Sequence, residues 1–385
     1  MNIVYIINQL RRSGPVIVLY DIIRNLDRAR FTPIIARLME DDPDRTMTQA
    51  FIAMGVEVIP LQYSFYDLEL KTAKVAHSLD QLLASRRVGI IHTHGYHPVL
   101  VASHMELKCP KIETLHCVCN ENFVDSKGIL LGTYMSQRYL NRLGKLQGCV
   151  AISDTVKRFY ARKIKSIPIR RIYNGIDSKR FHPISAIEKR ALRTKLGYSD
   201  QETIFVAIGS IGRGKDPLSV IKAFRSVFSD SDSCCNTRLV FLGKGPLLSR
   251  CRTLTESNPS IELKGYVTNA DEYLKIADCS ICASRSEGFG LNFIESVMAD
   301  VPVIGSDIGP FKEFIELYPD LKALQFHAGN SKELTERIRQ YRKTNIDISS
   351  FGIDARCRFS SERMAQEYMD FYTEIEYVQI IRRHA

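Results

Sequence analysis

The sequence predicts an α/β protein built from two Rossmann-like domains. Its 385 residues are too many for one ordinary domain and enough for two domains that each bury a core. Residues 2–7 form an apolar run, followed by a glycine-containing loop, a helical pattern at 16–26 and a second apolar run at 31–38. This order of strand, loop, helix and strand opens a Rossmann-like unit, and it recurs after residue 200.

The composition is that of a soluble globular protein, with 45% hydrophobic and 25% charged residues. No apolar run approaches the ~18 residues that suggest a membrane-spanning helix. The first ten residues lack the basic and long apolar regions of a signal peptide, so we expect them to form a strand. The ten cysteines are scattered, several within apolar runs, which indicates reduced, buried thiols and a cytoplasmic protein.

The charge of the chain is confined to its first half. Residues 1–182 contain 26 Lys/Arg and 16 Asp/Glu, a net charge of +10, whereas the remaining residues contain 27 of each. Such an asymmetry suggests that the first half faces an anionic surface or substrate.

Further strand patterns in the first half lie at residues 56–61, 89–94 and 111–117. We expect His92 to pack within the sheet. His94 and His116 follow apolar strand residues, where α/β folds collect their ligands. Histidines and cysteines near residues 92–119 suggest zinc, but this stretch contains no Cys-x-x-Cys and lacks a full ligand set, so we expect no metal.

Residues 129–148 have helical spacing, and a strand pattern at 148–153 leads into another helix. Seven Lys/Arg and no acidic residue lie between Lys157 and Arg171. A solvated helix face explains such a run. An anionic membrane surface explains it together with the charge asymmetry, and Phe159 and Tyr160 would then lie at the interface.

The second half begins with a charged helical pattern at 184–198, then a strand, a glycine-rich loop at 209–214 and a helix. The glycines of that loop are spaced GxxGxG rather than GxGxxG, and no ribose-binding acid ends the next strand, so nicotinamide binding is poorly supported. Asp-x-Asp occurs at 41–44 and within 229–236, in polar segments that we expect to be solvated loops rather than metal sites.

The segment at 284–297, SRSEGFGLNFIESV, carries Glu287 and Glu295 eight residues apart. Gly288 and Gly290 favour a loop after Glu287 and a helix that starts near Leu291. A helix N-terminus behind such a loop suits a phosphate, and flanking carboxylates suit sugar hydroxyl groups. A nucleotide-sugar has this layout. A capped strand-to-helix turn explains the spacing equally well.

The stretch SRSEGFGLNFIESVMADVPVIGSD resembles the Glu-(seven residues)-Glu signature of retaining glycosyltransferases of family four, which have the GT-B fold. The family pattern is SxxEGFGLxxxEAMAxGxPVI, and Ser296 and Asp300 replace its usual Ala and Gly. RRIYNGIDSKRFHP at 170–183 is similar to the family's vxvIpNGiDxxxFxP. The resemblance extends over nearly the whole chain and is weakest at 62–143.

The resemblance implies two Rossmann-like domains that face each other across a cleft. Residues 1–182 would bind the acceptor, residues 183–355 would bind the nucleotide-sugar, and a C-terminal helix at 356–385 would return to the first domain. Met364, Tyr368, Phe371 and Tyr372 have the helical spacing that this return needs.

The resemblance also implies roles for individual residues. As catalytic residues, Lys215 would contact the leaving diphosphate, Glu287 would hold the sugar hydroxyl groups, and His116 would contact the transferred sugar. On the donor side, Glu295 would bind the ribose, and Arg213 would replace the arginine that the family has at Ser210. The remaining donor contacts would come chiefly from the backbone at Gly265, Tyr266, Val267, Gly288, Phe289, Gly290, Leu291 and Asn292, and Gly14 and His94 would lie on the acceptor side.

The function implied is retaining transfer of a hexose from a UDP- or GDP-sugar to a glycan acceptor, without a cofactor, a metal or a nucleic acid. With the basic first half, it suggests a lipid-linked acceptor, cell-surface polysaccharide synthesis and peripheral attachment to the inner face of the membrane. Two alternatives stay open: a GT-B enzyme that transfers no sugar to a glycan, such as an epimerase or a phosphorylase, and an inactive sugar-nucleotide binding module.

Overall fold

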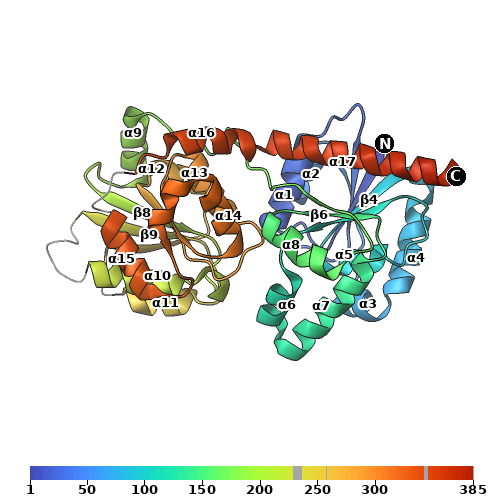
Figure 1. Cartoon of the computed structure of the whole chain (residues 1–385), viewed down its shortest axis with the longest axis horizontal. Helices are drawn as coiled ribbons and strands as arrows, with labels where there is room; N and C mark the ends of the chain where they lie inside the picture. Colours follow the sequence, from blue (N-terminus) through green and yellow to red (C-terminus); the bar gives the residue numbers. More distant parts are fainter. Residues whose placement is uncertain (229–235, 257, 342–345, 385) are drawn as a thin grey trace. The chain divides into compact units, whose positions relative to one another are not determined.

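The computed structural model describes the chain except residues 229–235, 257, 342–345 and 385. The chain divides into two compact units (Figure 1). The N-terminal unit consists of Met1–Gly175 and Ser361–Ala385, and the C-terminal unit consists of Ile176–Ser360. The division follows Gly175, where the sequence placed it after residue 182, and the chain returns at Ser361 rather than at 356.

The N-terminal unit contains, within the described residues, a parallel seven-stranded sheet in the order β3-β2-β1-β4-β5-β6-β7. Its strands are β1 (Asn2–Ile7), β2 (Thr32–Arg37), β3 (Glu57–Pro60), β4 (Val88–His94), β5 (Lys111–Leu115), β6 (Gly148–Ala151) and β7 (Ile169–Arg171). Its helices are α1 (Gly14–Arg24), α2 (Thr48–Ala53), α3 (Phe65–Leu70), α4 (Thr72–Leu83), η1 (Ala84–Arg86), α5 (Tyr96–Ala102), α6 (Cys119–Lys127), α7 (Ile129–Leu143), α8 (Asp154–Lys163) and α17 (Ser361–His384).

Both faces of this sheet are buried, as its runs of consecutive apolar residues require. Tyr5 and Ile7 of β1 point into one core, which α1 and α17 cover. Val4 and Ile6 point into the opposite core with residues of α4 and α5. The predicted strands at 2–7, 31–38, 56–61, 89–94 and 111–117 all form.

Helix α17 completes the N-terminal unit. Met364, Tyr368 and Tyr372 are fully buried, and Phe371 is nearly so. Tyr372 Oη lies 2.8 Å from His92 Nδ1 and 3.1 Å from Tyr5 Oη. The helical spacing predicted for these four residues is therefore confirmed, and so is the packing of His92 within the sheet.

The C-terminal unit contains, in its described part, a parallel six-stranded sheet in the order β10-β9-β8-β11-β12-β13. Its strands are β8 (Thr203–Ile208), β9 (Thr237–Leu242), β10 (Ile261–Gly265), β11 (Cys279–Cys282), β12 (Val303–Ser306) and β13 (Gln325–Phe326). Its helices are α9 (Ala186–Leu196), η2 (Arg213–Lys215), α10 (Pro217–Val227), α11 (Leu248–Thr255), α12 (Ala270–Ile276), α13 (Leu291–Met298), α14 (Gly309–Leu317), η3 (Pro319–Leu324), α15 (Ser331–Tyr341) and α16 (Ser349–Arg358).

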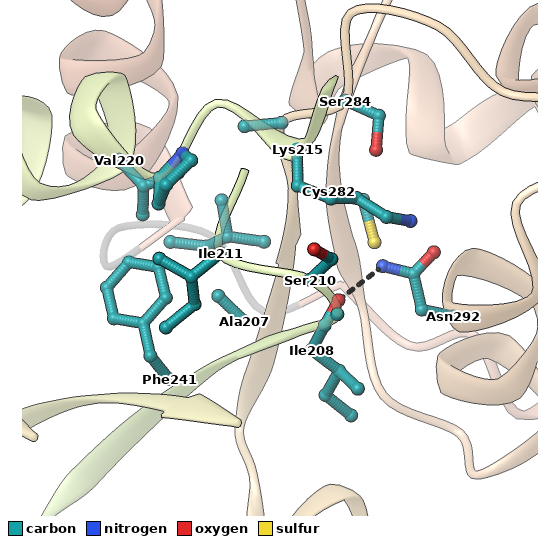
Figure 2. Close-up of a pocket in the computed structure, with 14 residues that line it drawn as sticks. Ala207, Ile208, Ser210, Ile211, Lys215, Val220, Phe241, Cys282, Ser284 and Asn292 are labelled. Atoms are coloured by element: carbon teal, nitrogen blue, oxygen red, sulfur yellow. Dashed lines mark hydrogen bonds between the residues drawn. The ribbon is translucent and has the colours of Figure 1, made fainter. Parts of the chain in front are cut away.

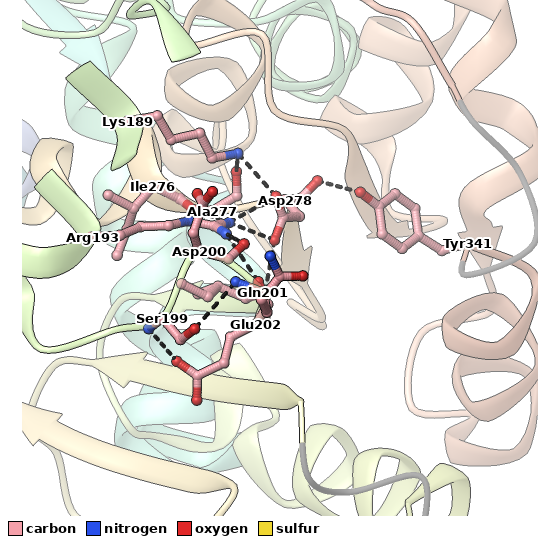
Figure 3. Close-up of polar contacts among 11 residues, drawn as sticks. Lys189, Arg193, Ser199, Asp200, Gln201, Glu202, Ile276, Ala277, Asp278 and Tyr341 are labelled. Atoms are coloured by element: carbon pink, nitrogen blue, oxygen red, sulfur yellow. Dashed lines mark hydrogen bonds and ion pairs between the residues drawn. The ribbon is translucent and has the colours of Figure 1, made fainter. Parts of the chain in front are cut away.

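A buried arginine joins α9 to the sheet of the C-terminal unit (Figure 3). Arg193 donates to both carboxylate oxygens of Asp278, at 2.9 and 2.7 Å, and to the carbonyl oxygens of Ile276, Asp200 and Glu202. Asp278 also accepts a hydrogen bond from the backbone N–H of Ile204 at 2.8 Å, so one carboxylate holds the starts of β8 and β11. This network lies at the amino ends of the strands.

The two Asp-x-Asp segments have different outcomes. In the first, Asp42 and Asp44 lie in a loop, and Asp44 is exposed, as expected. The side chain of Asp41 beside them is buried instead: it is 5% exposed, pairs with Arg37 at 3.3 Å and accepts hydrogen bonds from Thr46 and Thr48. The second Asp-x-Asp, within 229–236, falls outside the described residues. No disulfide joins the cysteines that the structure describes, and no helix in this part of the chain has the length and apolar character of a membrane span.

Candidate active site

Two loops at the carboxyl ends of β8 and β9 lie in backbone contact in the C-terminal unit. Gly243 has φ +151°, and a Cβ atom there would lie 1.9 Å from the carbonyl oxygen of Gly209. A Cβ atom on Gly245 would lie 2.4 Å from the carbonyl oxygen of Ile211. Only glycine permits such approaches, so these positions fix the path of the loop after β8.

That loop carries Lys215 to the segment after β11. The backbone N–H of Arg285 donates to the carbonyl oxygen of Gly214 at 2.8 Å, and the Arg285 side chain pairs with Asp216 at 2.8 Å. With the two loops joined, Lys215 Nζ forms an ion pair with Glu287, and Ser284 Oγ donates to Glu287 Oε1 at 2.7 Å. Residues about 70 positions apart in the sequence thereby form one cluster.

The two glutamates of the signature both act on the same ammonium group. Burial lowers the pKa of Lys215, but the paired Glu287 carboxylate, with a further contribution from Glu295, leaves that pKa above its usual value. Lys215 is therefore a stable cation at neutral pH. Its side chain is 29% exposed, so the cation stays accessible from solvent.

Helix α13 starts at Leu291, as the glycines predicted. Gly290 precedes it with φ +93°, and a Cβ atom there would lie 2.3 Å from the Phe311 ring. Asn292 Nδ2 donates to the carbonyl oxygen of Ile208 at 3.0 Å, which fixes the first turn of α13 against the end of β8. Asn292 Oδ1 is buried and has no hydrogen-bond partner among the described residues.

Phe289 does not present its side chain to the loop surface. The residue is 2% exposed, and its ring lies 5.1 Å from that of Phe314 and 5.9 Å from that of Phe359. These rings form an aromatic core beneath the loop. Any contact of Phe289 with a ligand above the loop would therefore come from its backbone.

Figure 2 shows the polar floor formed by these segments. Lys215, Ser210 and Asn292 point into the same small hollow, with Ser284 at its rim and apolar residues such as Phe241 and Val220 behind it. The hollow measures about 20 Å³, which is room for about one water molecule. Any larger molecule would have to lie outside this hollow.

The other predicted donor-side residues border the same strand ends. Arg213 opens the short helix η2 that ends at Lys215, and its side chain is exposed. Gly265, with φ +76°, accepts a hydrogen bond from the backbone N–H of Gly243 at 2.7 Å, so the turn at 265–267 adjoins the loop after β9. Tyr266 is 41% exposed there.

The predicted acceptor-side histidines meet in the N-terminal unit. His94 ends β4, His116 follows β5, and His94 Nδ1 lies 2.9 Å from His116 Nε2. Burial lowers the pKa of His94 well below its usual value and that of His116 to about 4, so both rings are neutral at pH 7. His94 Nε2 is buried without a hydrogen-bond partner in the described part of the chain. Gly14 begins α1 after Ser13.

Glu113, which the sequence did not single out, lies beside this pair on β5. The residue is fully buried, and burial raises the pKa of its carboxyl group to about 8. Its oxygens accept hydrogen bonds from Tyr139 Oη at 2.7 Å and from the backbone N–H of Gly95 at 2.9 Å. Glu113 therefore holds the loop that follows His94. An acidic residue within an apolar strand pattern was the sequence signal that could have identified it.

The predicted site residues thus form two groups, one in each unit. Among the described residues, no group of three or more His, Cys, Asp or Glu side chains could hold a metal ion. Arg285 and Asp216 are the residues that sequence reasoning missed in the C-terminal unit. Both adjoin motif positions, but their pairing depends on two loops that lie 69 residues apart in the chain.

Comparisons with known proteins cover both units. The family model "Glycosyltransferase Family 4" matches residues 12–180, and "Glycosyl transferases group 1" matches residues 188–356. The putative glycosyltransferase EpsD of Bacillus subtilis (strain 168) is 28% identical over 205 residues. The match covers 52% of this chain and 52% of EpsD, so it spans only about half of that relative. The O-antigen biosynthesis glycosyltransferase WclY of Escherichia coli is 23% identical over 383 residues, covering 97% of this chain and 99% of WclY.

A solved structure has the same fold. The crystal structure of HepE from Anabaena in complex with UDP has a TM-score of 0.76 and 16% identity, and the match covers 97% of this chain and 100% of HepE. The same Anabaena protein has also been solved with UDP-glucose.

Proposed function

The chain belongs to the family-four glycosyltransferases and has the GT-B fold, and we propose that it transfers a hexose-type sugar from a nucleotide-sugar to a glycan acceptor. The observation that carries this proposal is the cluster in the C-terminal unit. There a cation, Lys215, lies against Glu287 and within the electrostatic influence of Glu295, and it lines the same hollow as Asn292 in the first turn of α13, a helix whose N-terminus has no side-chain cap.

This cluster suits the parts of a nucleotide-sugar. The diphosphate would lie against Lys215, Arg213 and the backbone N–H groups that follow Glu287. The diphosphate, with its two negative charges, would compete with Glu287 for the ammonium group, and the released carboxylate would then accept hydrogen bonds from the sugar hydroxyl groups. Glu295 would bind the ribose. A nucleotide-sugar partner is also supported by HepE, whose structures contain UDP and UDP-glucose.

The chemistry proposed is transfer with retention at the anomeric carbon. Negative charge builds on the departing diphosphate while the sugar becomes oxocarbenium-like. Lys215, Arg213 and the N–H groups at the start of α13 would stabilise that charge through preorganised donors. A phosphate oxygen of the donor would take the proton from the acceptor hydroxyl group, and His116 would contact the transferred sugar.

We propose that the reaction needs no divalent cation, because Lys215, Arg213 and backbone N–H groups would neutralise the diphosphate. Turnover should then survive EDTA. A complete loss of turnover in EDTA that Mn²⁺ or Mg²⁺ restores would reject the cation-independent mechanism.

The acceptor proposed is a lipid-linked glycan in the synthesis of a cell-surface polysaccharide, at the inner face of the membrane. The similarity to the O-antigen glycosyltransferase WclY along nearly the whole chain supports this class of product. The net charge of +10 on residues 1–182 supports an anionic surface near the acceptor-side unit.

A panel of UDP-, GDP- and other nucleotide-sugars, scored by thermal shift and then by product formation, tests the proposal. One donor should stabilise the wild type, and NMR of the product should show the anomeric configuration of the donor. Glu295→Ala should weaken binding of the free nucleotide, since ribose contacts exist before the transition state. Failure of every donor to bind, or a product of inverted configuration, would contradict the proposal.

A further inference from the structure

The N-terminal unit has a concentration of exposed apolar side chains. Of the fifteen large hydrophobic residues that are exposed in the described part of the chain, seven lie on helices α3 and α7. We call these seven the apolar surface: Phe65, Tyr66, Leu70, Ile129, Leu130, Leu131 and Tyr134. Leu130 is 89% exposed and Ile129 is 74% exposed. Patches of this kind on a soluble unit mark an interaction site.

The two helices of the apolar surface are joined. Arg138 of α7 forms an ion pair with Glu69 of α3 and donates to the Glu69 carbonyl oxygen at 2.9 Å. Tyr134 lies one helical turn before Arg138, and Leu70 directly follows Glu69. Figure 1 shows α3, α6 and α7 together at one edge of the N-terminal unit.

The positions of the buried residues along α7 explain why the first turn of this helix is exposed. Its buried positions are Gly132, Met135, Ser136, Tyr139 and Leu143, which recur at helical spacing along one face. Ile129, Leu130 and Leu131 precede the first buried residue of this face, Gly132, and all three are exposed. This turn is more apolar than packing against the unit requires.

Basic groups follow the apolar turn along α7. Arg142 and Lys145, with Tyr134, Gln137, Arg138 and Asn141, line an open groove of about 440 Å³. Glu69 neutralises Arg138, so Arg142 and Lys145 supply the charge of the groove. No acidic residue occurs in the sequence between Asp125 and Asp154. Leu130 and Arg142 are twelve residues apart, which is about 18 Å along a helix.

We propose that the apolar surface inserts into an anionic lipid bilayer while the groove with Arg142 and Lys145 binds the phosphate of a lipid headgroup. Interfacial helices bury apolar side chains about 5–10 Å deep, so the first turn of α7 would enter the bilayer and the basic groups would lie at headgroup level. This inference rests on the proposed lipid-linked acceptor, and it identifies the surface that meets the membrane.

Helix α7 packs against α5 and α6, which follow the acceptor-side histidines in the chain. Helix α6 starts at Cys119, three residues after His116, and α7 follows it directly. Phe123 of α6 contacts Tyr96 of α5 at 5.3 Å between ring centroids, and Tyr96 is two residues after His94. An acceptor held at the membrane by α7 would therefore be near the carboxyl ends of β4 and β5.

The basic run at 157–171 is a weaker membrane surface than its sequence suggested. Lys157, Arg158, Arg162 and Lys163 are exposed on α8. Tyr160, however, is 1% exposed and donates to the carbonyl oxygen of Cys117 at 3.0 Å, so the expectation that it lies at an interface is wrong. Helix α8 offers charge without the exposed apolar residues that α7 has.

The natural sequence contains no tryptophan, so a single introduced tryptophan reports its own surroundings. Leu130→Trp should show a blue-shifted emission with phosphatidylglycerol vesicles and quenching by brominated lipid. Ile187→Trp is the matched control, because Ile187 is 80% exposed on α9 of the C-terminal unit. Its emission should not change. An unchanged Leu130→Trp emission, or an equal shift in both variants, would overturn the proposal.

Vesicle co-sedimentation measures how much the apolar and the basic residues each contribute to membrane binding. Leu130→Ser/Leu131→Ser should lower the partition coefficient by about tenfold or more, because each buried aliphatic side chain contributes at least that scale. Arg142→Gln and Lys145→Gln should each lower it about fivefold, with a smaller salt dependence. Ile187→Ser should leave it unchanged. If replacing Lys157, Arg158, Arg162 and Lys163 by Gln removes binding while the α7 variants retain it, α8 is the membrane surface and the proposal fails.

Two further measurements separate the possible failures. Sedimentation velocity without lipid should show a monomer, and a dimer that Leu130→Ser dissociates would assign the apolar surface to a second copy of the chain instead. Hydrolysis of the nucleotide-sugar in solution should be the same in Leu130→Ser and the wild type. Absence of nucleotide-sugar turnover in the wild type would reject the proposed function, whereas intact turnover without vesicle binding would reject only this inference.

Discussion

Lys215 illustrates how close backbone packing at glycines elsewhere in the fold can position one side chain. Its loop passes beneath Gly243, where a side chain would collide with backbone, and is joined to the segment of Glu287 through Arg285 and Gly214. Lys215→Ala should lower turnover by a factor of about 10² to 10³, the effect of losing one preorganised donor to developing charge. Its free energy of unfolding should change little, since Lys215 and Glu287 are both partly exposed.

Steady-state kinetics and urea denaturation of the same preparation check this prediction. Lys222→Ala is a suitable control because Lys222 is an exposed lysine on α10, outside the cluster. Full turnover in Lys215→Ala would remove Lys215 from the proposed mechanism.

Glu113 should make the stability of the protein depend on pH. Burial raises the pKa of its carboxyl group from 4.5 to about 8, so the folded chain keeps a proton that the unfolded chain releases. The free energy of unfolding should therefore fall as the pH rises from about 4.5 to 8, by at most ~1.4 kcal/mol per pH unit from this group. The neutral histidines act in the opposite direction, but only as the pH falls below about 6.5.

Glu113→Gln should remove the falling part of this profile. Denaturation midpoints measured from pH 5 to 8.5 would show a flatter curve for the variant, with the largest gain in stability at the alkaline end. Parallel curves for the wild type and the variant would mean that Glu113 is ionised in the folded state.

Among the elements, α9 depends on a single buried side chain. Arg193 is 4% exposed and reaches Asp278, which in turn holds the start of β8 (Figure 3). Arg193→Met should lower the free energy of unfolding by about 2–4 kcal/mol, because three carbonyl oxygens lose a donor and Asp278 keeps only Lys189 and the Ile204 N–H. Arg190→Met, on the same helix, removes an exposed pair with Asp200 and should cost less than about 1 kcal/mol.

Urea denaturation followed by circular dichroism distinguishes the two variants. Equal stability losses would show that the network at the amino ends of the strands contributes no more than an exposed ion pair.

Local patterns predicted the elements well where one face or both faces are apolar. The sequence predicted β1 at residues 2–7 from a run of apolar residues, and it predicted the start of α13 at Leu291 from the glycines before it. Helices α3 and α4 were not predicted, since their short patterns lie where the family resemblance is weakest. Buried polar partners such as Arg193 and Asp278, 85 residues apart, depend on tertiary packing that no local pattern reports.

The whole molecule consists of one continuous and one discontinuous unit. A fragment of residues 176–360 contains every strand of its sheet and should unfold cooperatively by itself. A fragment of residues 1–175 lacks Met364, Tyr368 and Tyr372, three fully buried side chains of its core. Loss of each is on the scale of 2–5 kcal/mol, and together they approach the ~5–15 kcal/mol that stabilises a typical protein.

Thermal melts followed by circular dichroism test this difference. The 176–360 fragment should give a sigmoidal transition and the 1–175 fragment should not, unless residues 361–384 are supplied as a peptide. A cooperative melt of the 1–175 fragment alone would show that α17 is dispensable for the N-terminal core.

The late position of α17 in the chain also sets an order of events on the ribosome. Tyr5 and His92 are translated before the C-terminal unit, yet their partner Tyr372 is translated only after the whole of that unit. At about 5–20 residues per second, the nascent sheet waits roughly 10–40 s for the helix that covers one of its faces. The unit translated second is thus the first that can be completed, and we expect a stop codon between residues 176 and 361 to leave the N-terminal unit without the helix that covers one face of its sheet.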